Sequence, residues 1–324
     1  MPHKNKPFEA VVISGGGIKG ILALGALHYY HEIGLYNPEL VTEYAGTSIG
    51  SAIGLLLICG YLPMEIFKEI YSMESFFTVK DCHSVWDIFK HTGLMSIESM
   101  INFIGDLVKK KLGHIPTLGK LKEITGKRLC TCGANVTKLS EETYTPETHP
   151  NLGALKAVMI SCNLPLIFQR LKYRDSFVID GGLINNYPWN YVSGGLNTLG
   201  ILIEVGTDCS FPDDEFLGYL YRTIMIPMTV LSDLRCQMTP SNIHTVRVGW
   251  KGGGTVLQFS MSSSTKMDMF LSGYRKVGEV ENTEYITVKG WDFFLHQDED
   301  GGDDFSELFD EEWGSFSDNV DEEK

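Results

Sequence analysis

Hydrophobic and polar positions divide the first sixty residues into two successive units of strand, turn and helix. Residues 8–14 form a short apolar run that predicts a buried strand, and apolar positions recur at helical spacing over 18–33. A second short run over 41–45 predicts another strand, which is followed by an apolar helix over 51–59. Two such units in succession are typical of a sheet with helices packed on it.

The rest of the chain continues this alternation. Helical spacing extends through most of 63–125 and recurs later, and short apolar runs predict further strands. The later helices are predicted over 152–160, 216–236 and 265–279, and the strands over 129–136, 176–180, 198–205, 246–249 and 256–259. No repeat or flexible linker divides residues 7–290. We therefore expect one α/β domain over 7–290, with three layers and a mostly parallel central sheet flanked by helices.

The negative charge of the chain is concentrated in its last residues. The formal net charge is −14, and residues 297–324 contain 13 acidic side chains and one Lys. The whole chain has 41 acids and 27 bases, so 28 acids and 26 bases remain for the nearly neutral part. Self-repulsion predicts that 297–324 is a disordered tail, and its spaced aromatic residues favour docking of a protein partner or masking of the chain's own surface. An acidic chain lacks the basic footprint of nucleic-acid binding.

Cysteine usage and the absence of long apolar segments indicate a cytoplasmic protein. The seven Cys are irregularly spaced, which provides no paired arms for zinc and suggests free thiols in a reducing compartment. The first residues do not resemble a secretion signal, and the longest apolar run, 53–59, is too short to span a membrane. Any contact with membranes is therefore expected to be peripheral.

A glycine-rich turn follows the first predicted strand and opens the first helix. Its sequence is Gly15-Gly16-Gly17-Ile18-Lys19-Gly20, which leaves backbone N–H groups accessible beside the positive end of a helix dipole. Two anions fit such a turn. One is the pyrophosphate of a dinucleotide, because the turn matches GxGxxG, and the other is the oxyanion of an acyl-transfer intermediate. A turn that merely packs the helix on the sheet is the third interpretation.

The second turn carries a serine at the centre of a GxSxG motif. Gly46-Thr47-Ser48-Ile49-Gly50 lies between a predicted strand and a predicted helix, as in the nucleophile elbow of serine hydrolases. Small flanking residues let the turn expose the Ser48 hydroxyl, although a helix-capping Ser is the structural alternative. If the glycine-rich turn forms an oxyanion hole and Ser48 is the nucleophile, the two turns together form one acyl-transfer site. A dinucleotide site in the glycine-rich turn would leave Ser48 without a role.

A third motif provides the base that a serine nucleophile needs. Asp180-Gly181-Gly182 follows a short predicted strand, where the carboxylate can line a cleft, although Asp before Gly also forms simple turns. No His occupies an obvious position for this role. His28 and His31 fall in the first helix, and His244 precedes a predicted strand.

The three motifs in this order resemble those of the patatin-like phospholipases, which use a Ser–Asp dyad. The resemblance covers residues 7–282 and includes the segment 163–168 and the helix that closes the domain. It implies a serine hydrolase of the phospholipase A or lysophospholipase type that degrades lipid by cleaving carboxylic esters. Ser48 would attack the ester of a glycerophospholipid and Asp180 would act as the base, with no metal, calcium or other cofactor.

The resemblance also implies roles for the glycines. The N–H groups of Gly15, Gly16 and Gly17 would bind the oxyanion. Ser14 stands where plant patatins have Asp, and Lys19 where many members have Arg, which affects the fine adjustment of the turn. The supporting motif residues are Lys19, Gly20, Gly46, Gly50, Gly181 and Gly182.

A phospholipid substrate requires contact with a membrane surface. The candidate region is 72–112, in which aromatic residues would anchor and Lys109–Lys111 would suit anionic headgroups. The alternative is that the aromatic residues belong to the core and the lysines to a solvated helix end. The aromatic residues are Phe76, Phe77, Trp86 and Phe89.

Two other functional classes compete with the lipid hydrolase. One is a nucleotide-binding oxidoreductase that uses the Gly15–Gly20 turn, and the other is a non-catalytic scaffold that retains the fold. Titration with NAD(P) would detect the first. The presence of Ser48, Asp180 and the glycine turn together argues against the second.

Overall fold

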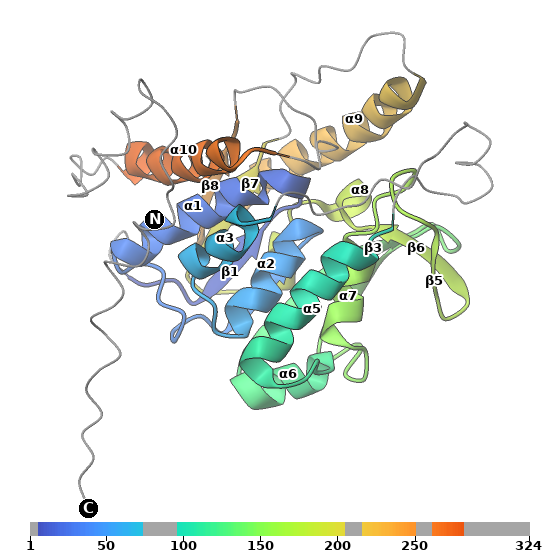
Figure 1. The fold of residues 1–324 in the computed structure, drawn as a ribbon, viewed down its shortest axis with the longest axis horizontal. Helices are drawn as coiled ribbons and strands as arrows, with labels where there is room; N and C mark the ends of the chain where they lie inside the picture. The colour runs from blue at the N-terminus through green and yellow to red at the C-terminus, as the bar shows by residue number, and fades with distance from the viewer. Residues whose placement is uncertain (1–5, 74–95, 205–215, 251–260, 282–324) are drawn as a thin grey trace, which may run out of the picture. The chain divides into compact units, whose positions relative to one another are not determined.

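The computed structural model describes residues 6–73, 96–204, 216–250 and 261–281 as an α/β fold built around an eight-stranded sheet (Figure 1). The strands are β1 (Ala10–Ile13), β2 (Glu43–Gly46), β3 (Arg128–Asn135), β4 (Ser140–Tyr144), β5 (Leu171–Tyr173), β6 (Ser176–Asp180), β7 (Thr198–Ile203) and β8 (Ile243–Val248). The α-helices are α1 (Gly20–Glu32), α2 (Ile49–Ile58), α3 (Pro63–Tyr71), α5 (Glu98–Leu112), α6 (Leu118–Thr125), α7 (Ala154–Ser161), α8 (Gly182–Asn185), α9 (Phe216–Gln237) and α10 (Ser263–Glu281). Two short 3-10 helices are η1 (Gly17–Lys19) and η2 (Trp189–Tyr191).

The centre of the sheet is parallel and one side of it is antiparallel. The strand order is β5-β6-β3-β2-β1-β7-β8, and neighbouring strands from β3 to β8 are parallel. Both β4 and β6 pair with β3 in the antiparallel direction, and β5 pairs with β6 in the same way. The predicted mostly parallel sheet is therefore confirmed. The polar strand β4 and the three-residue strand β5 lack the apolar runs that predicted the others.

Helices and irregular segments cover both faces of the sheet. Gly54 of α2 lies against Tyr44 and Leu129, which places α2 on the face that these two side chains share. The opposite face, formed by small and aliphatic residues, is covered by Tyr187 and by partly buried residues of η2 and α9. Its strand residues are Val12, Ala45, Cys130 and Leu202. The strands are thus buried on both sides, as expected of a parallel sheet.

Several predicted elements differ from the observed ones or lie outside the described residues. The helical region 63–125 consists of α3, α5 and α6, and β8 begins three residues before the predicted strand at 246. The predicted strand 256–259, the domain boundary at 290 and the acidic tail 297–324 lie outside the described residues. The compact unit that contains the sheet covers Met1–Glu281.

The closing helix α10 packs against α1 at a backbone crossing that excludes side chains. A Cβ atom added to Gly25 of α1 would lie 1.9 Å from the carbonyl oxygen of Phe270. A Cβ atom added to Gly273 of α10 would lie 2.0 Å from the carbonyl oxygen of Leu22. Because both obstacles are backbone atoms, no rotamer change relieves them, and glycine at both positions holds the two helices together.

We expect Gly273→Ala to lower the free energy of unfolding by roughly 3 kcal/mol or more, because the helices must separate. The matched control is Gly278→Ala on the same helix, where the added Cβ would lie 3.4 Å from the Tyr29 ring, an ordinary contact. Alanine there should be neutral or stabilise by up to about 1 kcal/mol through helix propensity. Urea denaturation followed by circular dichroism measures both, and equal midpoints would refute the crossing argument.

Candidate active site

Ser48 lies in a sharp turn between the end of β2 and the start of α2. Its backbone has φ 53° and ψ −128°, a left-handed conformation that costs a non-glycine residue about 1–3 kcal/mol. A Cβ at Gly46 would lie 2.4 Å from the backbone of Gly50, and a Cβ at Gly50 would lie 2.2 Å from the Ile13 carbonyl oxygen. The two glycines of the motif therefore allow the turn to close and present the Ser48 side chain.

Asp180 is the last residue of β6 and lies next to Ser48. The register aligns Gly46 of β2 with Thr131 of β3, and Asp180 with Gly133, two residues further along β3. The Asp180 carboxylate accepts a hydrogen bond from the Gly182 N–H at 2.7 Å, and the nearby Ser48 hydroxyl favours its ionised form by lowering its pKa. Strand pairing therefore brings together the two residues that were predicted as nucleophile and base.

The buried position of Asp180 changes its acidity. Only 4% of the residue is exposed, and burial raises the pKa of its carboxyl from 3.8 to about 6, against the opposing effects of the Ser48 hydroxyl and the Gly182 N–H. A carboxylate with this pKa is ionised at neutral pH and is a stronger base than an exposed Asp. This is the acidity that a general base needs near its working pH.

The glycine turn lies against the serine, but its three N–H groups are not equivalent. A Cβ at Gly15 would lie 3.2 Å from the Ser48 Cβ, so the turn and the elbow touch. The Gly15 N–H donates to the carbonyl oxygen of Asn186 at 3.2 Å, whereas the N–H groups of Gly16 and Gly17 have no backbone acceptor among the described residues. Only the latter two are free to bind an added anion.

The remaining predicted residues support this geometry from nearby positions. Gly20 lines the cavity beside Ser48, and its Cα approaches Ile49 so closely that a Cβ would lie 2.7 Å from that side chain. A Cβ at Gly181 would lie 2.5 Å from the Cys132 carbonyl oxygen, so this glycine lets β6 turn into α8. Lys19 is buried at the end of η1 and does not line the cavity.

Three residues of the site were not predicted. Ser161 accepts a hydrogen bond from the Ser48 N–H at 2.9 Å, and Cys162 lines the same cavity as Ser48. Burial raises the pKa of Cys162, which keeps this thiol neutral. Asn186 contacts the Gly15 loop. The end of α7 carries no motif, so only the folded chain reveals Ser161 and Cys162, whereas the distance from Asp180 could have suggested Asn186.

Ser48 and Asp180 open into an apolar cavity of about 120 Å³. Side chains from α1, α2, α5 and α9 and from the segment after α7 form its walls, including Ile21, Ile53, Leu56, Ile104, Phe168, Met225 and Met228. Among the residues that the structure describes, no His lines this cavity. His244 instead hydrogen-bonds with Tyr30 and lies 2.7 Å from the Glu281 carboxylate, a structural arrangement.

The described residues also bear on metals and membranes. In the parts of the chain that the structure describes, no three His, Cys, Asp or Glu side chains gather as a metal-binding group. The helices within the same parts lack the combination of length and apolarity that a membrane span requires.

Comparison with known proteins gives a consistent family. The family model for "Patatin-like phospholipase" matches residues 11–193, which include all three motifs. A "Probable lipid hydrolase" of Invertebrate iridescent virus 6 is 34% identical over 57% of this chain and 63% of its own length. The uncharacterized protein YqhO of Bacillus subtilis is 28% identical over 55% of this chain and 64% of its own length. The chain thus spans a little under two thirds of these relatives.

The fold is also similar to that of a solved structure. VipD from Legionella pneumophila superimposes with a TM-score of 0.51 at 18% identity, covering 85% of this chain and 67% of VipD. At this identity the likeness concerns the fold alone. Because the family model matches more than half of the chain, including the serine elbow and the Asp180 motif, the chain belongs to the patatin-like phospholipase family.

Proposed function

We propose that the chain is a lipid acyl hydrolase that cleaves carboxylic esters of glycerophospholipids. The observation that carries the proposal is that the Ser48 side chain and the buried Asp180 carboxylate line the same apolar cavity, where the Ser48 hydroxyl lowers the pKa of the carboxyl. A serine beside a base is the requirement for nucleophilic attack on an ester. The viral relative, whose name describes a probable lipid hydrolase, supports the same substrate class.

In the first step, the Ser48 hydroxyl oxygen attacks the ester carbonyl while Asp180 takes the hydroxyl proton. The carbonyl oxygen becomes negatively charged and needs hydrogen-bond donors. We assign these donors to the N–H groups of Gly16 and Gly17, because the Gly15 N–H already donates to Asn186. The positive end of α2, which begins at Ile49, adds to the stabilisation.

In the second step, the tetrahedral intermediate collapses and the lysophospholipid leaves with the proton that Asp180 holds. The acyl chain stays bound to Ser48 as an ester. Asp180 then removes a proton from a water molecule, which attacks the carbonyl of this ester. As the bond to the Ser48 oxygen breaks and the fatty acid leaves, Asp180 returns the proton to that oxygen and regenerates the hydroxyl. Every proton transfer uses Asp180, so the proposal requires neither calcium nor another cofactor. Activity that survives chelation by EDTA would support this part of it.

The shape and lining of the cavity support an acyl chain as ligand. Its walls are almost entirely aliphatic and aromatic side chains, which bind alkyl groups through burial of apolar surface. A dinucleotide would place charged phosphates in this apolar space. The oxidoreductase alternative therefore fits the lining poorly, and the scaffold alternative leaves the strained Ser48 backbone without a purpose.

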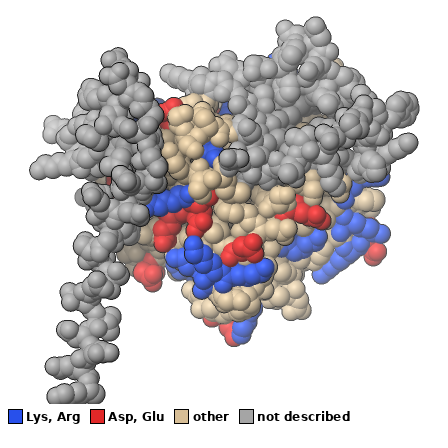
Figure 2. All heavy atoms as spheres, viewed as in Figure 1, with Lys and Arg blue, Asp and Glu red and all other residues tan. Residues whose placement is uncertain are grey.

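The described surface favours apolar rather than cationic contact with membranes. Lys109, Lys110 and Lys111 pair with Asp106, Glu69 and Glu65, respectively, at 3.2, 2.8 and 3.5 Å. On the face shown in Figure 2, basic and acidic side chains are interspersed. The predicted aromatic anchors between residues 76 and 89 lie outside the described residues, as does the tail that we propose as a docking segment for a protein partner.

Helix α9 offers the apolar contact instead. Met225 and Met228 line the catalytic cavity, while Ile226 and Val230 on the outer side are 64% and 53% exposed. The same helix therefore faces the proposed acyl site and solvent with apolar side chains. We propose that this outer face touches the lipid surface from which the substrate enters.

We expect Ser48→Ala to lower phospholipid hydrolysis more than about a thousandfold, because the nucleophile is lost. A fluorophosphonate probe should label the wild-type chain covalently and should not label this variant. The control is Ser72→Ala, which removes an exposed hydroxyl at the end of α3 and should change neither result. Undiminished hydrolysis by Ser48→Ala would show that the proposed mechanism is wrong.

The raised pKa of Asp180 predicts a pH dependence. Since only the ionised carboxylate accepts the Ser48 proton, kcat/KM should increase with pH through an apparent pKa of about 6 and then stay constant. An activity that rises only through pH 4, or that falls over this range, would contradict the role of a buried Asp180. A pH–rate profile with a soluble short-chain ester measures this without a lipid interface.

The raised pKa of Asp180 also makes the stability of the folded chain depend on pH, and stability decreases over the range in which activity increases. The folded chain holds the Asp180 proton up to about pH 6, whereas the unfolded chain releases it near 3.8, so stability falls as pH rises between these values. Asp180→Asn should therefore be more stable than wild type at about pH 8, by at most about 3 kcal/mol, although it is inactive. The advantage should vanish near pH 4, as denaturation at both pH values would show.

We expect Ile226→Ser combined with Val230→Ser to weaken co-sedimentation with phospholipid vesicles by about tenfold, because two exposed apolar contacts are lost. Replacement of Lys109, Lys110 and Lys111 by Ala is the comparison and should have a smaller effect, because these lysines are paired. The reverse ranking of the two variants would locate the membrane contact on α5 instead of α9.

A further inference from the structure

A second cavity lies at the end of α7 remote from Ser48. Its volume is about 260 Å³, and it is bounded by residues 148–153, by Lys156 in the first turn of α7 and by Tyr173 and Arg174 of the β5–β6 hairpin. The lining contains Lys156, Arg174, His149, Thr148, Asn151 and Tyr173 but no acidic residue. A cavity with two cations and no carboxylate has the electrostatic character of an anion site.

Lys156 is unusual among the cations that the structure describes. It is half-buried, and burial lowers the pKa of its ammonium group. The Lys156 ammonium contacts the sulfur of Met159 at 3.6 Å. Other half-buried or buried cations have oxygen partners. Lys127 and Lys266 donate to backbone carbonyl oxygens, and Arg128 to two carboxylates. A half-buried charge without such a partner is unfavourable, and an anion in the cavity would remove the penalty.

Arg174 adds a second positive charge to the same cavity. Its guanidinium lies over the Tyr173 ring at 5.2 Å, and neither Arg174 nor Lys156 forms an ion pair with any described residue. Arg174 and burial together lower the pKa of His149, with burial as the larger cause, so this ring is neutral at pH 7. Of the charged groups that act on the His149 ring, Arg174 lowers its pKa and Glu142 raises it.

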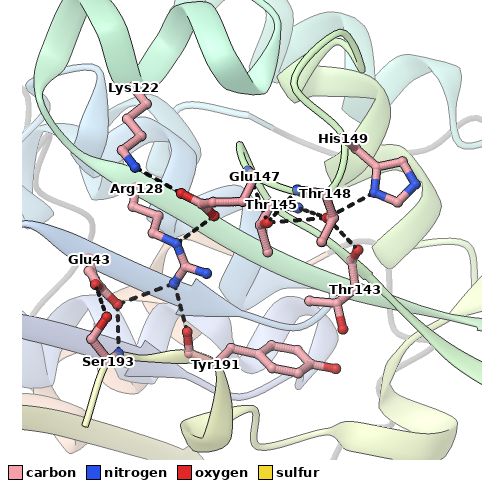
Figure 3. Close-up of polar contacts among 10 residues, drawn as sticks. All are labelled: Glu43, Lys122, Arg128, Thr143, Thr145, Glu147, Thr148, His149, Tyr191 and Ser193. Atoms are coloured by element: carbon pink, nitrogen blue, oxygen red, sulfur yellow. Dashed lines mark hydrogen bonds and ion pairs between the residues drawn. The ribbon is translucent and has the colours of Figure 1, made fainter.

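A network of polar side chains lies beside the cavity wall. This network also pairs Glu147, the acidic residue next to the cavity residues 148–153, with two cations. Figure 3 shows Glu147 between Lys122 and Arg128, at 2.8 and 2.9 Å, with Arg128 bonded further to Glu43. In the same view the His149 ring contacts the Thr148 hydroxyl at 3.0 Å. Because Glu147 is already paired twice, it is not a counter-ion for Lys156, and the loop needs little reorganisation to receive a ligand.

We propose that this cavity binds a phosphate group, either free phosphate or the phosphomonoester of a headgroup. Lys156 supplies a point charge and Arg174 a planar pair of N–H donors, which together suit the oxygens of a phosphate dianion. The cavity is separate from the catalytic site. Helix α7 connects them and has eight residues, a length of about 12 Å.

The first test uses inorganic phosphate and the full chain. Phosphate should raise the thermal midpoint of the wild type by mass action and should raise the pKa of the His149 ring in an NMR titration. Lys156→Met, which keeps the length of the side chain, should weaken phosphate binding about tenfold or more through loss of a charge-assisted contact. Without phosphate this variant should be at least as stable as wild type, so a failure to fold would be recognised.

The control is Lys172→Met on the same hairpin. Lys172 is exposed and does not line the cavity, so its removal changes the net charge equally and should alter phosphate binding less than about twofold. Equal weakening by both variants would mean non-specific attraction and would overturn the proposal. So would the absence of any phosphate effect on the wild type at millimolar concentration.

A second arm identifies the source of the phosphate. Vesicles of phosphatidylcholine with added phosphatidic acid present a phosphomonoester, and those with phosphatidylserine present only diesters. Binding that needs phosphatidic acid, is displaced by phosphate and is lost in Lys156→Met would assign a lipid headgroup. Phosphate binding without this selectivity would assign a soluble ligand. All measurements are repeated with Ser48→Ala, so that the outcome does not depend on the proposed hydrolase activity.

Discussion

The close approach of three backbone segments around Gly46 and Gly50 is the constraint on which the site depends. No side chain fits at either glycine, because Cβ atoms there would lie 2.4 Å or less from neighbouring backbone atoms. The chain can therefore pass from β2 into α2 within two residues, and Ser48 takes the strained backbone that this passage requires. The same compact turn brings Gly15 against Ser48, so the donors, the nucleophile and the start of α2 are arranged by one packing contact.

The position of Asp180 follows from the antiparallel side of the sheet. Asp180 pairs with Gly133, which lies two residues beyond the level of Gly46, so strand β3 sets the height of the base relative to the nucleophile. Gly133 also has little room for a side chain, because an added Cβ would lie 2.9 Å from Ile160 of α7. Helix α7 can therefore pack close to β3, and its last residue, Ser161, reaches the Ser48 backbone N–H.

The residues of the catalytic motifs could be predicted from the sequence, but the long-range contacts that bring them together could not. Ser48 and the glycine turns belong to motifs whose geometry follows from backbone sterics, so the position of each of these residues in its turn could be predicted. The two strands that position Asp180, β3 and β6, were predicted, but no local pattern indicated that they pair with each other in the antiparallel direction. The polar strand β4 and the three-residue strand β5 on the same side of the sheet were not predicted. The hydrogen bond from Gly15 to Asn186 was equally hidden, because it joins residues 171 positions apart. Long-range pairing of this kind leaves no local pattern.

Burial links substrate choice and catalysis in this site. The apolar walls that suit an acyl chain are also the reason that the Asp180 carboxylate loses hydration and that its pKa rises to about 6. A more polar cavity would lower this pKa and weaken the base, whereas a cavity without the Gly182 N–H and the Ser48 hydroxyl would raise it further and protonate the base at neutral pH. The Gly182 N–H and the Ser48 hydroxyl therefore keep a buried carboxylate ionised at neutral pH, where the base is needed. Desolvation of the Asp180 carboxylate makes it a stronger base and also lowers the stability of the folded chain at neutral pH, so the two effects have one cause.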